Sequence, residues 1–318
     1  MKILILGAKG RFGRNAVQAA LAAGHEVTAF ARSWDRAVNR PSLSHATGNA
    51  MDAEALIQAG QGADLVLNAL NPPYEAWAKT LLPMTRAVLQ ACEALGIPQL
   101  AIGNLYAYGK DMPARLTAAT PKAPSNPLAK VRYAADQAMA TSKVSTLLFR
   151  GGDFLEGTST GNWFDTYMTR DVAKGRFAYP GPANLPHSFA YLPDMARAAL
   201  ALAGQVSGQE GFEEVLFPGY TLSGQQLCDL SSEAIGQPLQ LTHFPWPILR
   251  AMSLVSPRMR GVVHMSYLWR TPHEVDGANF HRRVPDFRAT PLRQAFAEMM
   301  AVKSLAANRG ADPRAVPA

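Results

Sequence analysis

The stretch Lys2–Val17, KILILGAKGRFGRNAV, decides the fold of this chain. Four apolar residues run directly into Gly7, and Gly10 and Gly13 follow at three-residue intervals before a helical pattern begins. A short apolar strand, a glycine-rich turn and a helix form the opening of a βαβ nucleotide-binding unit. The spacing therefore predicts a dinucleotide-binding site at the N-terminal end of the chain.

Each of the three positions requires glycine for a physical reason in such a unit. Gly7 allows the tight turn off the strand, Gly10 lets the backbone approach a pyrophosphate, and Gly13 lets the helix pack close to the sheet. The free N–H groups at the start of the helix then face the phosphates. The cofactor site is expected to include Gly7, Lys9, Gly10, Arg11, Phe12 and Gly13.

Apolar runs alternate with helical patterns through the first 150 residues. Strands are expected at residues 3–6, 26–31, 44–48, 64–69, 99–103 and 144–149, and helices at 15–23, 53–59, 75–95 and 128–141. Strands that alternate with helices are typical of an α/β fold with a doubly wound parallel sheet. We therefore predict a dinucleotide-binding core over residues 1–155.

The regular alternation stops after residue 150. Short strands are expected at 215–217 and 239–243, and helices at 189–202, 223–235, parts of 245–265, and 290–302. This composition predicts a small α+β substrate lid over residues 156–303, interleaved with the last elements of the core. The small, polar and proline-containing segment 304–318 is expected to be a frayed tail.

The end of the second expected strand bears on the choice of cofactor. At this point of the fold a carboxylate binds the ribose 2′-hydroxyl of NAD, whereas an arginine accommodates the 2′-phosphate of NADP. Here Ala31 occupies the acidic position and is followed by Arg32 and Ser33, and Arg11 could close the other side. NADP is favoured over NAD, unless Arg32 is a solvated surface charge.

Two further segments are expected to border the cofactor. Asp52 precedes an expected helix, so it either contacts the adenine or caps that helix. Asn68, Ala69 and Leu70 begin the loop after the fourth strand, which we expect to lie over the cofactor.

Composition excludes several classes of protein. The chain has 318 residues, of which 48% are hydrophobic and 17% charged, and no apolar stretch reaches the roughly 18 to 20 residues of a membrane-spanning helix. The formal charge of +7 comes from dispersed basic residues, which argues against a nucleic-acid partner and suits phosphate-bearing ligands. An N-terminus without a signal pattern predicts a cytoplasmic protein. Cys92 and Cys228 are expected to be reduced thiols, and no metal site is expected.

Four motifs together resemble a known superfamily. They are the glycine turn 7–13, Asn104-Leu-Tyr-Ala-Tyr-Gly109, Arg150-Gly-Gly-Asp-Phe154 and Tyr191-Leu-Pro-Asp194. Over residues 1–300 the chain resembles the extended short-chain dehydrogenase/reductases, more narrowly their atypical NAD-dependent epimerase/dehydratase-like branch. The resemblance implies an NAD(P)-binding Rossmann fold and a small-molecule substrate, and its relatives' helical dimer face implies a homodimer.

The sequence departs from this family at the catalytic positions. The family uses a serine or threonine after the fifth strand and Tyr-x-x-x-Lys on the next helix, where the lysine lowers the pKa of the tyrosine. Here Asn104 stands at the serine position, Leu128 at the tyrosine and Arg132 at the lysine. Leucine cannot transfer a proton, so the usual mechanism does not carry over.

Several residues could substitute for the missing groups. Tyr106 or Tyr108 could supply the phenol while Asn104 orients a carbonyl oxygen, or both tyrosines could be core residues with bonded hydroxyls. Arg132 could hold the nicotinamide ribose as the lysine would, or could be a surface charge. The catalytic candidates are therefore Asn104, Tyr106, Tyr108 and Arg132.

Loop and aromatic residues of the second half give weaker signals. Asp153 and His187 are expected near the cleft, where each is either catalytic or a capping or turn group. The aromatic residues Trp163, Phe164, Tyr167 and Trp246 either line an apolar substrate pocket or belong to ordinary core.

The leading hypothesis is an NADP-dependent oxidoreductase that acts on a small carbonyl or alcohol without Tyr-x-x-x-Lys. A sugar-nucleotide epimerase or dehydratase is an alternative, although it also needs the missing tyrosine. An NADP(H)-binding sensor without turnover is the third possibility, and Leu128 fits it equally well.

Overall fold

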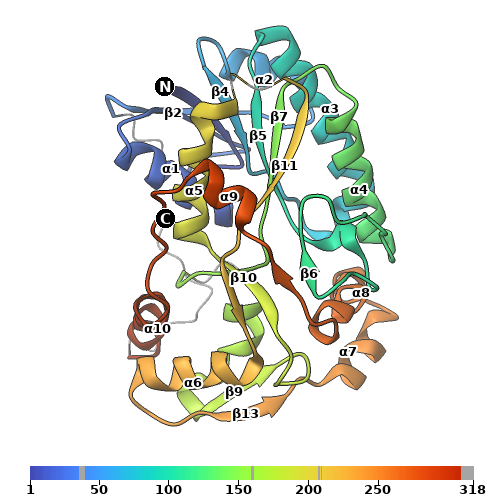
Figure 1. Cartoon of the computed structure of the whole chain (residues 1–318), viewed down its shortest axis with the longest axis vertical. Helices are drawn as coiled ribbons and strands as arrows, with labels where there is room; N and C mark the ends of the chain where they lie inside the picture. The colour runs from blue at the N-terminus through green and yellow to red at the C-terminus, as the bar shows by residue number, and fades with distance from the viewer. Residues whose placement is uncertain (36–39, 159–160, 207, 209, 309–318) are drawn as a thin grey trace.

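A seven-stranded parallel sheet forms the centre of the molecule (Figure 1). The computed structural model describes residues 1–35, 40–158, 161–206, 208 and 210–308. The strands lie in the order β11-β7-β5-β4-β1-β2-β3. Their bounds are β1 Lys2–Leu6, β2 Glu26–Ala31, β3 Leu43–Thr47, β4 Leu65–Asn68, β5 Gln99–Gly103, β7 Thr146–Arg150 and β11 Phe212–Leu216. The predicted doubly wound α/β fold is confirmed.

Helices cover both faces of this sheet because its strands are apolar on both sides. In β1, Ile3 and Ile5 pack with α1 (Arg11–Ala22) and α5 (Leu192–Val206) on one face. Leu4 and Leu6 point the opposite way, as alternation along a strand requires. That second face is covered by α2 (Ala53–Ala59), α3 (Trp77–Leu95) and α4 (Pro127–Ala140).

The outermost strand of the central sheet comes from the second half of the chain. The strand expected at 215–217 begins at Phe212 and pairs in parallel with β7, from Phe212 opposite Thr146 to Leu216 opposite Arg150. The chain therefore leaves the central sheet after β7 and returns about sixty residues later to add its outermost strand.

The remaining elements form a smaller lobe below the sheet in Figure 1. It contains a sheet of β8 (Asp153–Leu155), β10 (His187–Tyr191) and β12 (Tyr220–Leu222), and a pair of strands, β9 (Arg176–Tyr179) and β13 (Gln240–His243). Its helices are α6 (Gly224–Ile235), α7 (Trp246–Ser253), α8 (Pro257–His264) and α10 (Leu292–Asn308). An aromatic core fills it, around Phe164, Phe177 and Trp269.

Short elements join the two lobes. The two-residue strands β6 (Arg115–Leu116) and β14 (Glu274–Val275) pair in parallel, and α9 (Ala278–Arg283) follows β14. Single turns of helix are η1 (Tyr74–Ala76), η2 (Tyr106–Tyr108), η3 (Phe164–Met168), η4 (Val172–Lys174) and η5 (Ser266–Arg270). Those of two or three residues are too short to show a hydrophobic period in the sequence.

The structure also differs from the expected boundaries at the first helix and at the segment before α5. The first helix begins at Arg11 instead of Asn15, because the helix starts directly from the glycine turn. Residues 187–191 form a strand, and α5 then begins at Leu192. Of the segment expected to be a frayed tail, residues 304–308 continue α10 and residues 309–318 lie outside the described residues, so that expectation stays a prediction.

Candidate functional site

The glycine turn has the shape of a phosphate cradle. Gly7 adopts a left-handed φ of 73°, and the N–H groups of Gly7 and Ala8 both donate to the Phe30 carbonyl at 3.1 Å. A Cβ atom on Gly13 would lie 2.1 Å from the Gly7 carbonyl oxygen, so only glycine allows this approach of helix and turn. The start of α1 carries no acidic residue and no side-chain cap. Its first N–H groups can therefore bind a pyrophosphate, and the turn fits a dinucleotide.

Charged side chains surround the mouth of this cradle. Lys9 forms an exposed ion pair with Asp35, a residue that the sequence analysis did not single out, at 2.9 Å. Arg11 Nη2 donates to the Gly161 carbonyl at 2.8 Å, which ties the glycine turn to the smaller lobe. Phe12 is buried in the core, so its side chain supports the turn, whereas Arg32 is exposed at the end of β2.

The loop after β4 lies directly against the glycine turn. The Ala69 N–H donates to Leu6 O at 3.1 Å, and a Cβ on Gly7 would lie 3.0 Å from Ala69 O. Asn68 Oδ1 accepts the Leu70 N–H at 3.2 Å and so fixes the start of the loop. The structure thus brings Asn68, Ala69 and Leu70 together with the glycines.

Asp52 has a structural role in this arrangement. Its Oδ1 accepts the N–H groups of Glu54 at 3.0 Å and Ala55 at 3.4 Å. The side chain therefore caps α2, which is one of its two expected roles.

Arg132, expected either near the nicotinamide or on the surface, is buried with 6% of its surface exposed. Its Nη2 donates to Asn71 Oδ1 at 3.0 Å, and the guanidinium lies 4.8 Å from the centre of the Trp77 ring. Among the described residues its Nε has no hydrogen-bond partner. Burial lowers the pKa of Arg132, while the Asp136 carboxylate opposes that shift. The cation therefore borders the loop over the cradle.

Tyr106 forms a pair with a second tyrosine that sequence reasoning missed. The hydroxyls of Tyr74, in η1, and Tyr106, in η2, lie 2.6 Å apart, and Asn104 Oδ1 accepts the Tyr106 N–H at 3.1 Å. Burial raises the pKa of Tyr74 to about 12 and raises that of Tyr106 well above its ordinary value. Both groups are therefore neutral phenols at physiological pH.

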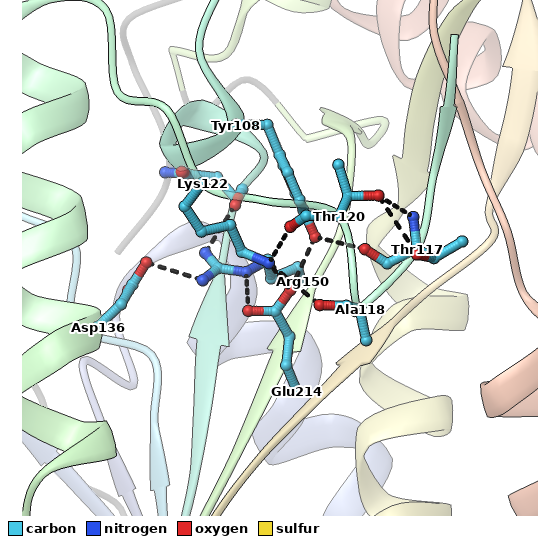
Figure 2. Close-up of polar contacts among 9 residues, drawn as sticks. Tyr108, Thr117, Ala118, Thr120, Lys122, Asp136, Arg150 and Glu214 are labelled. Carbon is cyan, nitrogen blue, oxygen red and sulfur yellow. Dashed lines mark hydrogen bonds and ion pairs between the residues drawn. The ribbon is translucent and has the colours of Figure 1, made fainter. Parts of the chain in front are cut away.

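Tyr108 points away from this pair, although it is only two residues further along η2. Its hydroxyl donates to Glu214 Oε1 at 2.7 Å and also lies 3.2 Å from the Thr117 carbonyl oxygen. Figure 2 shows this hydroxyl within a group of buried charges beneath the turn. The structure thus places Tyr108 in a network of the protein's own residues.

Arg150 holds that network together (Figure 2). Its guanidinium lies 2.8 Å from Asp136 Oδ2 and 2.8 Å from Glu214 Oε2, and Nη1 donates to Asn104 O at 3.0 Å. Lys122 Nζ lies 2.8 Å from Glu214 Oε1. Burial alone would lower the pKa of Arg150, but the Asp136 and Glu214 carboxylates outweigh it, so the pKa of Arg150 is raised. Burial alone would raise the pKa of Glu214, but Arg150 and Lys122 outweigh it, so the pKa of Glu214 is lowered. Arg150 and Glu214 therefore stay ionised.

Asp153 and His187, the two loop candidates, form a pair. Asp153 begins β8 just after the carboxyl end of β7, and His187 begins the neighbouring strand β10. His187 Nε2 lies 2.7 Å from Asp153 Oδ2. The imidazole stacks on Trp269 with ring centroids 4.3 Å apart, and His273 meets its edge at 4.4 Å. The His187 side chain is 2% exposed and that of Asp153 12%.

The charge of the Asp153 carboxylate acts on four buried tyrosines. Burial raises the pKa of Tyr74, Tyr106, Tyr179 and Tyr267, and the negative charge of Asp153 raises each of them further. These tyrosines come from η1, η2, β9 and η5, so Asp153 lies where segments of both lobes converge. This point is at the carboxyl edge of the sheet, where ligands bind in doubly wound folds.

The aromatic candidates of the lid belong to its core. Phe164 and Trp246 are buried, and Trp163 packs edge-on against Trp269 at 5.2 Å. Tyr167 contacts Trp163 at 5.2 Å. A cleft of about 430 Å³ adjoins this cluster, lined by Tyr179, Pro180, Gly181, Phe244, Trp246 and Arg270 among others.

The described residues lack two kinds of feature. They contain no helix that is long and apolar enough to cross a membrane. They also contain no group of three or more His, Cys, Asp or Glu side chains placed to hold a metal ion. Cys92 and Cys228 are buried and unpaired.

Comparison with known proteins agrees with this geometry. The model of a family described as NAD(P)H-binding matches residues 7–173, which is more than half of the chain. A 3-diazoavenalumate denitrifying reductase from a Streptomyces species is 28% identical over 220 residues, covering 63% of this chain and 71% of the relative.

Solved structures share the fold over nearly the whole chain. A UDP-glucose 4-epimerase from Bifidobacterium longum has a TM-score of 0.74 at 14% identity, covering 97% of this chain and 99% of the epimerase. A dTDP-glucose 4,6-dehydratase from Bacillus anthracis has a TM-score of 0.74 at 13% identity, covering 96% of this chain and 97% of the dehydratase. With the glycine cradle and the family match over 7–173, the chain belongs to the NAD(P)H-binding family of Rossmann-fold proteins.

Proposed function

We propose that this protein is an NADP-dependent oxidoreductase that interconverts a small carbonyl compound and its alcohol. The observation that carries the proposal is the convergence of a phosphate cradle with neutral phenols at the same edge of the sheet. The Tyr74–Tyr106 pair can donate a hydrogen bond to a substrate oxygen, as a carbonyl group requires. A reductase among the curated relatives supports this reaction class.

The preference for NADP rests on the end of β2. Ala31 leaves no carboxylate at the position that binds the 2′-hydroxyl of NAD, and Arg32 follows it with an exposed side chain. Within the described part of the chain, Arg32 makes no hydrogen bond or ion pair. Asp35 is the competing feature, because its carboxylate is near Lys9 and could accept from a ribose hydroxyl.

The chain's own residues bind the cofactor and activate the substrate. When bound, the nicotinamide supplies hydride transfer. Arg132 and Asn71, joined at 3.0 Å, are positioned to hold the ribose beside the loop after β4. Tyr106, fixed by Tyr74 and by the Asn104 turn, is positioned to polarise the substrate oxygen.

Calorimetric titration with NADPH and NADH tests the cofactor assignment, in wild type, Arg32→Ala and Asp35→Ala. A charge-assisted contact to the 2′-phosphate contributes about 1.5–3 kcal/mol, so Arg32→Ala should weaken NADPH binding about 10- to 100-fold and spare NADH. Asp35→Ala should leave NADPH binding intact. Equal losses for both cofactors in Arg32→Ala, or an NADH preference that Asp35→Ala removes, would contradict the NADP assignment.

Turnover separates an enzyme from a sensor. NADPH oxidation with a panel of aldehydes and ketones, sensitive to Tyr106→Phe, is expected for an oxidoreductase. Tight NADPH binding without turnover would instead favour a regulatory protein, which Leu128 also fits. We further propose a cytoplasmic location, supported by the two unpaired thiols, and a homodimer, for which light scattering of the purified protein is the direct test.

A further inference from the structure

We infer that Asp153, oriented by His187, is the group that exchanges a proton with the substrate, in place of the family's missing tyrosine. This inference rests on the proposed oxidoreductase function and assigns the acid–base step within it.

Asp153 lies at the edge of the sheet where ligands bind in doubly wound folds. Asp153 follows β7 directly and lies at the carboxyl edge of the sheet, on the same edge as the glycine turn after β1 and the Tyr74–Tyr106 pair. Its side chain keeps 12% of its surface exposed, whereas the His187 side chain behind it keeps 2%. The carboxylate therefore separates the buried imidazole from the open side of the site.

His187 fixes the orientation of the Asp153 carboxylate. His187 binds Oδ2 of Asp153, and no described residue forms a hydrogen bond with Oδ1. The imidazole cannot swing away, because Trp269 stacks on its face within 7° of parallel and His273 and Phe189 contact its ring. One carboxylate oxygen is thus fixed, and the other is left for a substrate hydroxyl.

The nearby phenols are unsuited to the same task. In the family, a lysine lowers the pKa of the tyrosine so that a phenolate can accept a proton. Here burial and the Asp153 charge raise the pKa of Tyr74, Tyr106, Tyr179 and Tyr267. These groups can donate hydrogen bonds at neutral pH, but they do not ionise, so the proton must go to another acceptor.

With Asp153 as the proton acceptor, both the hydride and the proton of the reaction have a destination. Oxidation of an alcohol removes one hydride from carbon, which the nicotinamide cofactor of the proposed function takes up, and one proton from the hydroxyl oxygen. Asp153 Oδ1 accepts that proton as the O–H bond breaks and the C=O bond forms, and reduction returns it to the oxygen.

The same surroundings indicate the substrate class. A carboxylate among neutral phenols repels an anionic group and accepts from a hydroxyl. The tyrosines on which the Asp153 charge acts come from both lobes. A neutral alcohol or carbonyl compound with an apolar or aromatic body fits these groups.

Kinetics over a range of pH test the assignment, with NADPH and a panel of neutral aromatic and aliphatic aldehydes and ketones. Asp153→Asn should lower kcat about 10²- to 10⁴-fold, the range of general acid–base catalysis, and remove one limb of the pH profile. Its NADPH dissociation constant, measured by calorimetry, should stay within twofold of wild type. Asp171→Asn, which removes a surface carboxylate paired with Lys174, is the matched control and should change neither quantity.

His187→Gln tests the positioning role separately. Glutamine can still donate one N–H to Oδ2, so we expect a loss of about tenfold in kcat and a displaced pH limb with unchanged NADPH affinity. In the free protein at neutral pH, the NMR chemical shifts of the His187 ring protons should change in Asp153→Asn, which alters the group bonded to Nε2, and stay in place in Asp171→Asn. This second measurement does not depend on turnover.

Failure of the Asp153 assignment can be distinguished from failure of the proposed oxidoreductase function. A folded Asp153→Asn variant that binds NADPH and keeps kcat and its pH profile within threefold of wild type would overturn the assignment. If Asp153→Asn does not fold by circular dichroism, a His187→Gln variant with the wild-type pH profile overturns it instead. Wild-type protein that turns over none of the panel refutes the proposed function itself.

Discussion

Tyr106 and Tyr108 lie two residues apart on one turn, yet their hydroxyls enter different environments. Tyr106 meets Tyr74 at 2.6 Å near Asp153, at the edge of the sheet where ligands bind. Tyr108 donates to Glu214, which is itself bound by Arg150 and Lys122. The first environment leaves polar groups available to a ligand, whereas the second has matched its charges internally.

The difference shows how one short motif serves two purposes. Residues i and i+2 of a single helical turn point in different directions. The Tyr106 side therefore builds the candidate site, and the Tyr108 side attaches the turn to the core through a buried ion network. We expect substitutions on the two sides to separate activity from stability.

The largest effect is expected from Arg150→Leu. It leaves the buried Asp136 and Glu214 carboxylates without their shared cation, and breaking a buried pair from one side costs about 3–5 kcal/mol. Urea unfolding should show this loss in the free energy of unfolding. Arg115→Ala, which removes an exposed ion pair with Asp276, should change it by less than about 1 kcal/mol. A loss below 1 kcal/mol for Arg150→Leu would mean that the network contributes little to stability.

The two tyrosines give the most direct comparison. Tyr106→Phe should lower kcat about 100-fold, the effect of removing one hydrogen-bond donor to a developing oxyanion. Tyr108→Phe should keep kcat within about threefold and lower the free energy of unfolding by about 1–2 kcal/mol. Steady-state kinetics and urea unfolding of both variants check this. The comparison fails if Tyr108→Phe is the variant that loses activity while remaining stable.

We expect acid to lower the free energy of unfolding of the protein through His273, which packs against His187. Burial, followed by the neighbouring His187, lowers the pKa of His273 to about 3. Its unfolded pKa is about 6.5, so between these values the unfolded chain binds the extra proton and stability falls as the pH falls below 6.5. Between pH 7 and pH 5 we expect a loss of about 1–2 kcal/mol in urea unfolding.

His273→Gln should make unfolding less sensitive to pH over this interval, whereas His281→Gln, at an exposed position, should not. An identical pH dependence in His273→Gln and wild type would show that other groups cause the acid sensitivity.

The smallest effect is expected from Lys122→Met. Lys122 binds Glu214 at 2.8 Å and lies 4.3 Å from the centre of the Tyr108 ring, but Arg150 still neutralises Glu214 without it. We expect a loss of about 1 kcal/mol. The double variant with Tyr108→Phe should lose less than the sum of the two, because both residues bind the same carboxylate oxygen. Strict additivity would indicate that the two contacts are independent.

The fold and the cradle could be predicted because their signals are local. Gly7, Gly10 and Gly13 encode a turn and a close approach within a dozen residues, and alternating strands and helices encode the sheet. The direction of Tyr106 and Tyr108 could not be predicted, because it depends on Glu214, which is about a hundred residues away. Asp35 and Tyr74 were missed because each meets its partner only after segments distant in sequence pack together.

The late return of β11 to the central sheet has a consequence for synthesis. The chain is made from the N-terminus, and domains usually fold as they emerge from the ribosome. Here β7 lacks its outer neighbour, and Arg150 lacks Glu214, until residue 216 has been made. The nascent first half therefore holds an open sheet edge and an incompletely paired buried cation while about sixty further residues are translated, a length set by the positions of β7 and β11. We expect the unpaired edge of β7 to make the nascent chain prone to aggregation during that interval.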